Sequence, residues 1–330
     1  MDVVVDQQGI AQTGQNGQPG DDAASKPRSV FVVLNPMAGT SDADTVRATL
    51  EQHFGPAGIE YDVYETTGDE DLAEIVRQAV ERGVDIAVAA GGDGTVSEVA
   101  NAVAGRPTAL ALLPVGTANV LARELGIPID LQQAVALIAG QHATKAIDAM
   151  KVGDRHFVLQ IGVGLDSLMI RDTDRESKRR FGQIAYLWTL GTRLLGYQPR
   201  RFTVYADGER RRPRAAQVLI ANGGALGVQS LRWGPDITPS DGQIDVCVIG
   251  ARTLIDYLGL VWHTLTGQQR RNRNVRYMHA QRSIAVNADR PLPVQADGEI
   301  IGETPVQVTV VPAAVNVVVP QDAKEPGATN

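Results

Sequence analysis

The sequence predicts an α/β N-terminal domain with a doubly wound parallel sheet, followed by a mostly antiparallel β domain with helices on one side. Three observations predict this fold class. Strand-like and helix-like segments alternate through the first half of the chain. Glycine-containing loops follow three of the strand-like segments, as in nucleotide-binding α/β domains. After about Ala149 the apolar segments become short, rich in Val and Ile, and bounded by Gly, Asp and Pro.

The first domain is expected over residues 28–148. Its strands are short apolar runs, and its helices show apolar residues at helical spacing, as Val96, Val99, Ala100 and Val103 do. In chain order we expect a strand at 29–34, a helix at 42–54, a strand at 59–64, a helix at 70–82, a strand at 84–90, a helix at 95–104, a strand at 108–113, and helices at 117–125 and 131–140.

The second domain is expected over 149–320, with its last segment a candidate to return to the first domain. Antiparallel strands are predicted at 156–163, 202–206, 215–221, 244–249, 283–287 and 305–319, with helices near 180–196 and 252–267. Residues 1–27 are rich in Gln, Gly, Asp and Ser, which indicates a disordered tail, and 321–330 are expected to form another.

Composition excludes several classes of protein. The chain of 330 residues is 43% hydrophobic and 21% charged, which is ordinary for a globular protein. Its single cysteine, Cys247, cannot form an intrachain disulfide and is interpreted as a small buried hydrophobe. No apolar run approaches the ~20 residues of a membrane span, and the first residues do not resemble a signal peptide. We therefore expect a cytoplasmic protein that contacts the inner face of the membrane at most. Exposed edge strands in the second domain would also allow a homodimer.

Positive charge is concentrated in the second half, although the net charge is −7. Residues 171–214 contain 12 Lys and Arg against 5 Asp and Glu, and residues 257–288 contain 5 Arg and no carboxylate. These basic segments either face an anionic surface or form solvent-exposed faces of helices and hairpins, and the sequence does not decide between the two. Lys178-Arg179-Arg180 precedes an apolar, aromatic helix at 181–190, which either rests on a membrane and admits a lipid tail or packs as a core helix.

The strand-to-helix turn Gly91-Gly92-Asp93-Gly94-Thr95 is the most informative motif. Its glycines let the backbone approach a ligand, and the helix N-terminus behind it favours an anion, so the turn predicts phosphate binding. Asp93 can hold Mg²⁺ or accept a proton. A glycine-rich turn with a helix-capping Asp is the structural alternative.

Two further loops follow strands in the same way, at 35–40 and 114–119. Because the carboxyl ends of parallel strands meet at one edge of a sheet, we expect the three loops to converge on one polyphosphate.

With these motifs in place, the chain resembles the bacterial diacylglycerol kinase family, whose catalytic domain is shared with sphingosine and ceramide kinases. The resemblance runs from Ser29 to about Pro320. It rests on Asn35-Pro36 with Gly39, the 91–95 turn with Glu98 and Asn101, Pro114–Asn119, Gly162–Asp166, Asn222-Gly223-Gly224, Pro239–Asp245 and Asp297-Gly298-Glu299.

The resemblance implies a two-domain kinase that transfers the γ-phosphoryl group of Mg·ATP to the hydroxyl of diacylglycerol or a related lipid. Expected partners are therefore a lipid substrate at the membrane surface, and not nucleic acid. Matching positions imply that the nucleotide is contacted by Asn35, Pro36, Gly39, Thr40, Thr66, Gly91, Gly92, Gly94, Thr95, Ser97, Glu98, Gly116, Thr117 and Asn119.

The family also implies catalytic and metal-binding roles. Asp297 is the expected base with Glu299 beside it, and Asp93 organises Mg·ATP; in sphingosine kinases the position of Asp93 is usually given the base's role. Asp297-Gly298 also favours a hairpin turn, and both interpretations are compatible. Asp166 is expected to contact the substrate. A structural Mg²⁺ would take the Asp241 carboxylate and the backbone carbonyls of Thr238 and Gln243.

Two departures from the family pattern affect the phosphate and metal sites. Many family members have an Asp at the position of Val120, and that Asp belongs to the acidic network around magnesium. In this chain Asp93 and Asp166 are the remaining acids of the network. Ala38 replaces a frequent Ser.

Two other functions remain as alternatives. A small-molecule kinase like NAD kinase or phosphofructokinase shares the Gly-Gly-Asp-Gly turn, and a non-catalytic lipid- or nucleotide-binding regulator is suggested by Val120. The Pro114–Asn119 and Asp297–Glu299 motifs favour a lipid kinase. The acceptor stays open among diacylglycerol, monoacylglycerol, ceramide-like bases and phosphatidylglycerol, because apolar pockets tolerate variation in the chain.

Overall fold

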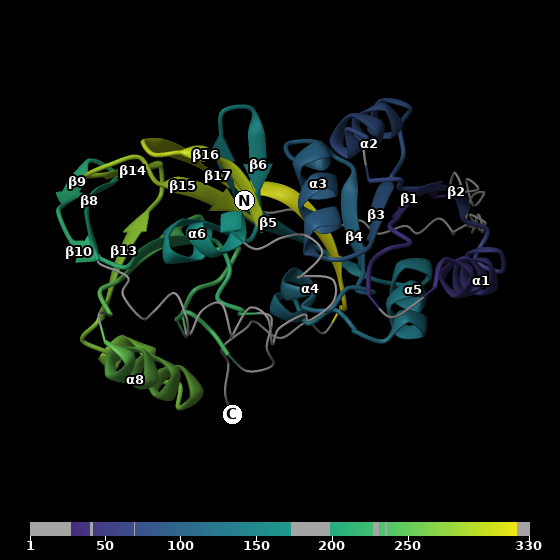
Figure 1. Ribbon diagram of the computed structural model, residues 1–330. Helices are drawn as coiled ribbons and strands as arrows, with labels where there is room; N and C mark the ends of the chain where they lie inside the picture. The colour runs from purple at the N-terminus through teal and green to yellow at the C-terminus, as the bar shows by residue number, and fades with distance from the viewer. Residues whose placement is uncertain are drawn as a thin grey trace, which may run out of the picture.

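The computed structural model describes residues 28–39, 42–68, 70–172, 199–226, 231–234, 236–251 and 253–321. Its N-terminal part is a parallel sheet in the order β4-β3-β1-β2, and Figure 1 shows helices above and below that sheet. The elements are β1 Ser29–Leu34, α1 Ala43–Phe54, β2 Glu60–Glu65, α2 Leu72–Glu81, β3 Ile86–Ala90, α3 Asp93–Val103, β4 Ala109–Leu113, α4 Val120–Glu124 and α5 Leu131–Ala139.

Helices cover both faces of this sheet, which confirms the doubly wound arrangement. α2 and α3 bury Val76 and Val99 in one apolar cluster, whereas α1 and α5 bury Leu50 and Ile138 in another on the opposite face. The strands between them are nearly continuous apolar runs because both of their faces are covered.

The helix starts follow from local chemistry. Asp42, Asp71 and Asp130 each accept a hydrogen bond from the backbone N–H three residues later, at 2.7, 3.0 and 3.0 Å, and so cap α1, α2 and α5. α3 differs, because its N-cap is Gly92 and no side chain caps it. The first amides of α3 are therefore available to a ligand.

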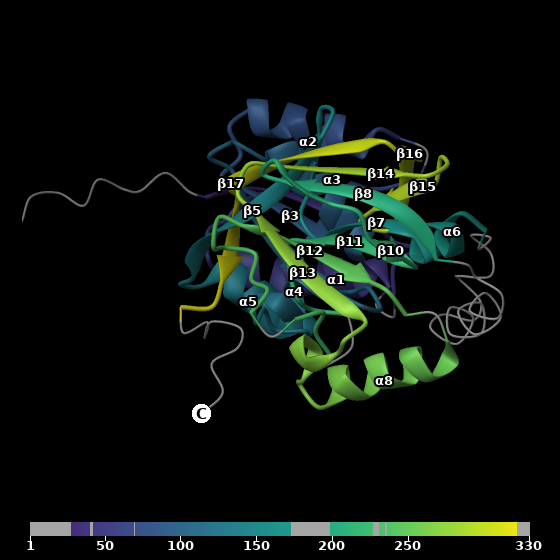
Figure 2. The ribbon, with the colours of Figure 1, turned by 90° about the vertical axis from the view of Figure 1, so that its left-hand side faces the viewer.

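The C-terminal part is a β-sandwich with helices at its side. A sheet in the order β13-β12-β11-β7-β15-β16 packs on β8, β14 and β17, and Figure 2 shows these layers. The elements are β5 Ala143–Val152, β6 Arg155–Phe157, β7 Gln160–Gly164, α6 Leu165–Asp172, β8 Arg200–Ala206, β9 Glu209–Arg211, β10 Arg214–Ala215, β11 Gln217–Ala221, β12 Ile244–Ile249, α8 Leu254–Leu265, the 3₁₀ turn Gln269–Arg271, β13 Val275–Ala280, β14 Ser283–Ala288, β15 Pro293–Ala296, β16 Glu299–Glu303 and β17 Val306–Val319.

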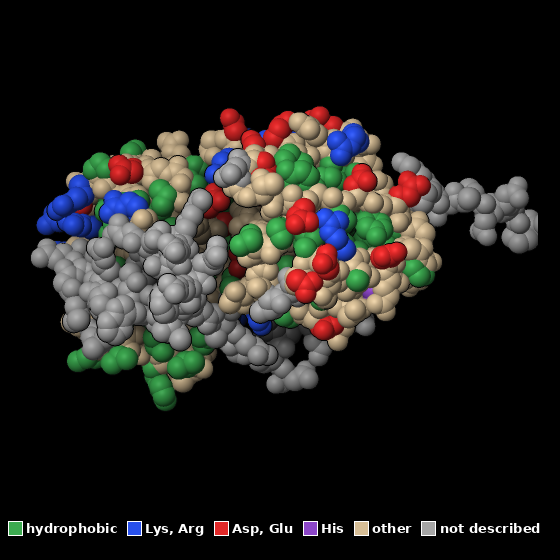
Figure 3. All heavy atoms as spheres, turned by 45° about the vertical axis from the view of Figure 1, so that its right-hand side comes forward, with side chains coloured by type: hydrophobic (Ala, Val, Ile, Leu, Met, Phe, Trp, Pro, Cys, Tyr) green, Lys and Arg blue, Asp and Glu red, His purple; other side chains and the backbone are tan. Residues whose placement is uncertain are grey.

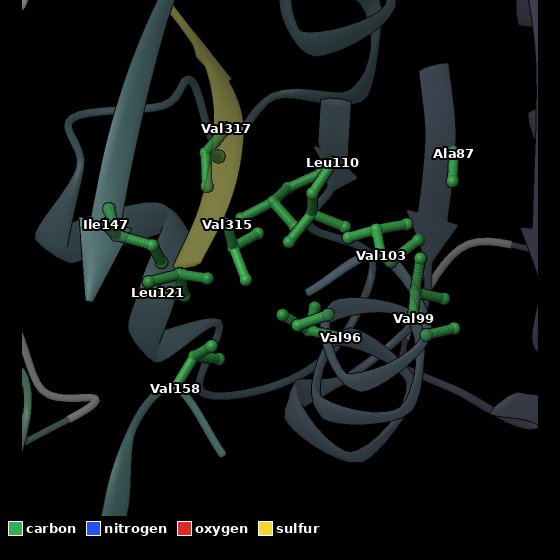
Figure 4. Close-up of a cluster of buried hydrophobic side chains, with 14 of the residues drawn as sticks. Ala87, Val96, Val99, Val103, Leu110, Leu121, Ile147, Val158, Val315 and Val317 are labelled. Atoms are coloured by element: carbon green, nitrogen blue, oxygen red, sulfur yellow. The ribbon is translucent and has the colours of Figure 1, made fainter. Parts of the chain in front are cut away.

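Strand β17 joins the two parts. It pairs antiparallel with β14 and β5, and parallel with β4, where Val317 faces Leu110. Val308 lies in the sandwich core, whereas Val315 and Val317 lie in a core of the α/β part. Figure 4 shows Val315 and Val317 next to Leu110 and Leu121. One strand therefore contributes to the cores of both parts of the molecule.

Several predicted elements need correction. The run 156–163 is two strands, β6 and β7, because Val158 and Leu159 between them turn their amides toward Asp297. The helix expected at 117–125 begins only at Val120, because Asn119 is left-handed, with φ 49°. The strands β5, β9, β13, β15 and β16, the helix α6 and the 3₁₀ turn were not predicted from the sequence. Thr40, the tail 1–27, the helix expected at 180–196 and residues 322–330 lie outside the described residues.

Candidate active site

The loops that follow β1, β3 and β4 meet at one edge of the parallel sheet. A Cβ on Gly116 would lie 2.5 Å from the Gly92 Cα, and one on Gly39 would lie 1.5 Å from the Val115 carbonyl oxygen. Only glycine permits these approaches, and Gly39 also has a positive φ of 69°. The first two loops are joined as well, because Asn35 Nδ2 donates to Thr95 Oγ1 at 3.3 Å. The predicted convergence of the loops is therefore present.

Asp93 sits in the first turn of α3 and is tied to the third loop. Its Oδ1 accepts a hydrogen bond from the Val120 N–H at 2.7 Å. Burial raises the pKa of Asp93 above its usual value, and the backbone hydrogen bonds from Val120 and Asn119 oppose that shift. Asn119 is held in its left-handed conformation by hydrogen bonds from its Nδ2 to the carbonyl oxygens of Pro114 and Gly116. Val120 thus acts on Asp93 through its backbone.

Asp297 lies at the tip of the β15–β16 hairpin, where positive φ values at Asp297 (47°) and Gly298 (93°) form the predicted turn. The carboxylate is buried. It accepts hydrogen bonds from the amides of Val158, Leu159 and Gln160 at 3.1, 3.2 and 2.8 Å.

The fourth donor to Asp297 is Ser97 Oγ of α3, at 2.9 Å, so this contact joins the two domains. Burial raises the pKa of Asp297 to about 6, although its four donors favour the charged form. A carboxylate with a pKa near the working pH can accept a proton from a substrate and release it again.

A second buried acid supports the same turn. Asp166 Oδ2 accepts a hydrogen bond from Gln295 Nε2 at 3.0 Å, and Gln295 Oε1 accepts one from the Gly298 N–H at 3.1 Å. Gln295 is fully buried, and burial raises the pKa of Asp166 to about 6. The chain Asp166–Gln295–Gly298 therefore fixes the hairpin that carries Asp297.

A cavity of about 770 Å³ opens beside α3, and Figure 3 shows the surface hollowed between the two domains. Across it Arg155 of β6 makes ion pairs with Glu98 of α3 and Glu299 of the hairpin. Burial raises the pKa of Glu98, and the Arg155 charge lowers it. The lining is Asn35, Thr66, Gly68, Glu70, Asp71, Leu72, Ala73, Arg77, Gly94, Thr95, Glu98, Asn101, Asp154, Arg155 and Glu299.

A second cavity, of about 820 Å³, is lined by Asp93 and Asp297. Asp166 also lines it, and the remaining walls are mostly apolar. They come from Val120, Leu121, Glu124, Val158, Leu159, Gln160, Leu165, Gln217, Gly223, Ala225, Leu226, Leu231, Trp233, Ile249, Tyr257, Leu258, Leu260, Val261, Thr264, Leu265 and Gly298. Glu124, which the sequence did not single out, is buried and paired with Arg232 at 2.8 Å.

The structure separates the predicted site residues into groups. Asn35, Thr66, Gly94, Thr95, Glu98 and Glu299 line the first cavity, and Asp93, Asp166 and Asp297 line the second. Pro36, Gly39, Gly91, Gly92, Ser97, Gly116, Thr117 and Asn119 line neither cavity, although most of them shape the converging loops or hold Asp297. Arg77 and Arg155 were missed, since single arginines form no motif.

The expected structural magnesium site lies apart from both cavities. Asp241 is exposed, and its Oδ1 accepts a hydrogen bond from the Gln243 N–H at 3.0 Å. Partial burial of the Asp241 carboxyl group and the nearby Asp148 charge raise its pKa even though the residue as a whole is exposed, so a cation there would relieve repulsion between two acids. One carboxylate with the carbonyls of Thr238 and Gln243 suits a hard cation that keeps several waters. Within the described ranges, no cluster of three or more His, Cys, Asp or Glu side chains is arranged to hold a metal ion.

Each half of the chain matches a family model of known proteins. A family model described as diacylglycerol kinase catalytic domain matches residues 29–152, and one described as YegS C-terminal NAD kinase beta sandwich-like domain matches residues 160–319. The diacylglycerol kinase of Bacillus subtilis (strain 168) is 28% identical, with 89% of this chain and 97% of that protein covered.

Two further comparisons extend this result. A protein of Stenotrophomonas maltophilia (strain K279a), named as a probable YegS-like lipid kinase, is 31% identical over 81% of this chain and 89% of its own. The crystal structure of a diacylglycerol kinase from Bacillus anthracis str. Sterne superposes with a TM-score of 0.75 at 25% identity, covering 90% of this chain and 99% of that one. The fold and its domain order are therefore those of lipid kinases.

Proposed function

The chain belongs to the family of diacylglycerol kinases and YegS-like lipid kinases, and we propose that it transfers the γ-phosphoryl group of ATP to the hydroxyl of diacylglycerol or a related lipid. The observation that carries the proposal is that consecutive residues of two short segments line two different cavities. Asp93 lines the second cavity and Gly94 the first; Gly298 lines the second and Glu299 the first. A phosphoryl group transferred from a ligand in one cavity to a ligand in the other would come close to Asp93 and Asp297.

The first cavity suits a nucleotide. Its wall includes Gly94 and Thr95 in the uncapped first turn of α3, where free amides and the helix dipole stabilise phosphate charge. Phosphoryl transfer needs positioning and neutralisation of charge more than covalent chemistry, and these amides supply part of both. The carboxylates of Glu98 and Glu299, held by Arg155, can accept hydrogen bonds from the hydroxyls of a ribose.

Magnesium is the expected companion of the triphosphate. Asp93 fits as the protein ligand of this Mg²⁺, because the Val120 N–H holds its Oδ1 in place. Burial raises the pKa of the Asp93 carboxyl group, and no cationic side chain is its main partner, so a bound cation would stabilise its charged form. A bound Mg²⁺ would supply positive charge to the transferring phosphoryl group. Asp166 already accepts hydrogen bonds from Gln295 and the Ser167 amide, so its carboxylate does not need a metal to be satisfied.

The second cavity suits a lipid acceptor. It is apolar over most of its lining, and Asp93, Asp166 and Asp297 are among its few acidic lining residues. A lipid with a free hydroxyl can place its head against these acids and its acyl chain along the apolar residues of α8. We assign the proton of the acceptor hydroxyl to Asp297, whose pKa of about 6 suits a base at neutral pH.

A radiolabelled-ATP assay on lipids in mixed micelles with Mg²⁺ tests the function. The panel contains diacylglycerol, monoacylglycerol, ceramide, a long-chain base and phosphatidylglycerol, with NAD as a control acceptor. We expect one labelled lipid, absent with Asp297→Asn, and no labelled NAD. Label on NAD would contradict the proposal. ATP binding without label on any lipid would favour the non-catalytic regulator.

A further inference from the structure

We propose that helix α8 docks on an anionic lipid bilayer and places the mouth of the acceptor cavity against it. The proposal rests on the proposed function, because it explains how a lipid would reach that cavity. Figure 2 shows α8 at the edge of the molecule, standing off from the sheets of the sandwich.

The outer side of α8 is unusually apolar for an exposed surface. Ile255 is 79% exposed and Trp262 is 65% exposed, and both side chains lie outside the cavity lining. Leu258, Val261 and Leu265 are exposed as well. Among the described residues these five account for the only group of large exposed hydrophobics on one helix. An apolar helix with a Trp is typical of elements that lie in the membrane interface.

The same helix forms part of the acceptor cavity. Leu258, Val261 and Leu265 contribute both to the exposed face and to the cavity lining, together with Leu260 and Tyr257 on the inner side. Apolar side chains of α8 therefore reach both the outside of the molecule and the cavity wall. A lipid moving along α8 would keep its acyl chain in apolar surroundings throughout, as extraction from a bilayer requires.

Charge favours a bilayer over a second copy of this chain. Residues 257–288 carry five arginines and no carboxylate; Arg270 is paired with Asp236, whereas Arg271 and Arg273, just beyond α8, are exposed. Anionic headgroups attract such residues. A second copy docked by a two-fold contact on this face would instead bring the same arginines toward one another. No described helix is long and apolar enough to cross a membrane, so α8 would lie in the interface.

Flotation with vesicles tests the docking directly. The double variant Ile255→Gln, Trp262→Gln removes exposed apolar groups outside the cavity lining, and Ile129→Gln, at a 39%-exposed position between α4 and α5, is the matched control. On phosphatidylglycerol-rich vesicles we expect the double variant to bind at least ~10-fold more weakly than the control and the wild type. Arg273→Ala should weaken binding about fivefold at low salt and little at high salt.

An activity assay separates this proposal from the proposed function. With a short-chain, water-soluble diacylglycerol, the double variant should match the wild type, whereas on long-chain lipid in vesicles its rate should fall in parallel with binding. Equal vesicle binding by the double variant and the control would overturn the docking. A sedimentation mass that falls from dimer to monomer in the double variant would assign the face to a second copy. Absence of kinase activity in the wild type on every lipid would instead count against the proposed function and leave the flotation result standing.

Discussion

At the scale of single residues, the protonation state of Asp297 decides whether it can act as a base. Burial raises its pKa to about 6, so the ionised, active form dominates above that pH and is lost as the pH falls through it. We expect kcat/KM to be level above pH 7 and to fall about tenfold per pH unit below 6. Asp297→Asn and Asp93→Asn should each lower turnover at least ~100-fold.

The variant Ser97→Ala tests whether Asp297 is the group that causes this pH dependence. Its hydroxyl donates to Asp297 Oδ2 and favours the charged carboxylate, so Ser97→Ala should move the acid limb of the pH–rate profile to higher pH. An acid limb at the same pH in both proteins would show that Asp297 does not titrate in that limb.

The buried amide of Gln295 gives a second prediction at this scale. Gln295→Met keeps most of the side-chain volume but leaves Asp166 Oδ2 and the Gly298 N–H without their shared partner. We expect kcat to fall about tenfold or more, because the hairpin carrying Asp297 loses its support, while KM for ATP changes little. The same substitution at Gln307, exposed on β17, is the control. A change in KM for ATP alone would contradict a positioning role.

At the scale of elements, the start of α3 predicts a contrast between two glycines. A Cβ added at Gly94 would meet open space, and Ala is the better helix former, so Gly94→Ala should leave thermal stability unchanged or slightly raised. If phosphate approaches the first turn closely, the added methyl group should raise KM for ATP at least ~10-fold.

Gly116→Ala should instead destabilise the protein. Its Cβ would lie 2.5 Å from the Gly92 Cα, so two backbones would have to separate. We expect a lower Tm, measured by thermal unfolding, as well as weaker binding of ATP. Equal stability losses in the two variants would argue against the loop geometry described here.

The elements that the sequence predicted best are those whose patterns are local. The parallel strands β1, β3 and β4 are continuous apolar runs, and three helices begin at Asp residues that cap them, so their bounds were found within a few residues. The short strands β15 and β16 were missed, because β15 contains a buried Gln295 and β16 is mostly exposed. Their patterns do not alternate clearly.

The same distinction applies to the site. The glycine loops could be predicted because each is a motif within a few residues, and their convergence follows from parallel-strand geometry. The Ser97–Asp297 contact joins residues 200 positions apart, and Arg155 meets Glu98 and Glu299 from a third element. The apolar α8 was predicted as a helix, but its share in the acceptor cavity depends on tertiary packing. Pairings over such separations leave no trace in a single sequence.

At the scale of the whole molecule, β17 makes the two domains one cooperative unit. It pairs with β14 at its start, with β5 from Thr309 to Val319 and with β4 near its end, and its valines enter the cores of both domains. All three partners lie with β17 in one continuous sheet, so displacement of β17 would expose apolar surface in both domains. The two domains should therefore unfold together even though each has a core of its own.

Truncation of one valine in each core tests this coupling. Val308→Ala affects the sandwich core and Val315→Ala the core of the α/β part, and both side chains are buried. Each should lower the free energy of unfolding by about 2 kcal/mol, from lost apolar burial and the cavity left behind. In urea, tryptophan fluorescence and far-UV circular dichroism should report one coincident transition for the wild type and for both variants, shifted to lower urea in each variant. Two transitions, of which Val308→Ala shifts only one and Val315→Ala only the other, would show that β17 does not couple the domains. Coincident shifts would mean that the cleft between the domains, with Asp297 held by Ser97, is present only when the whole chain is folded.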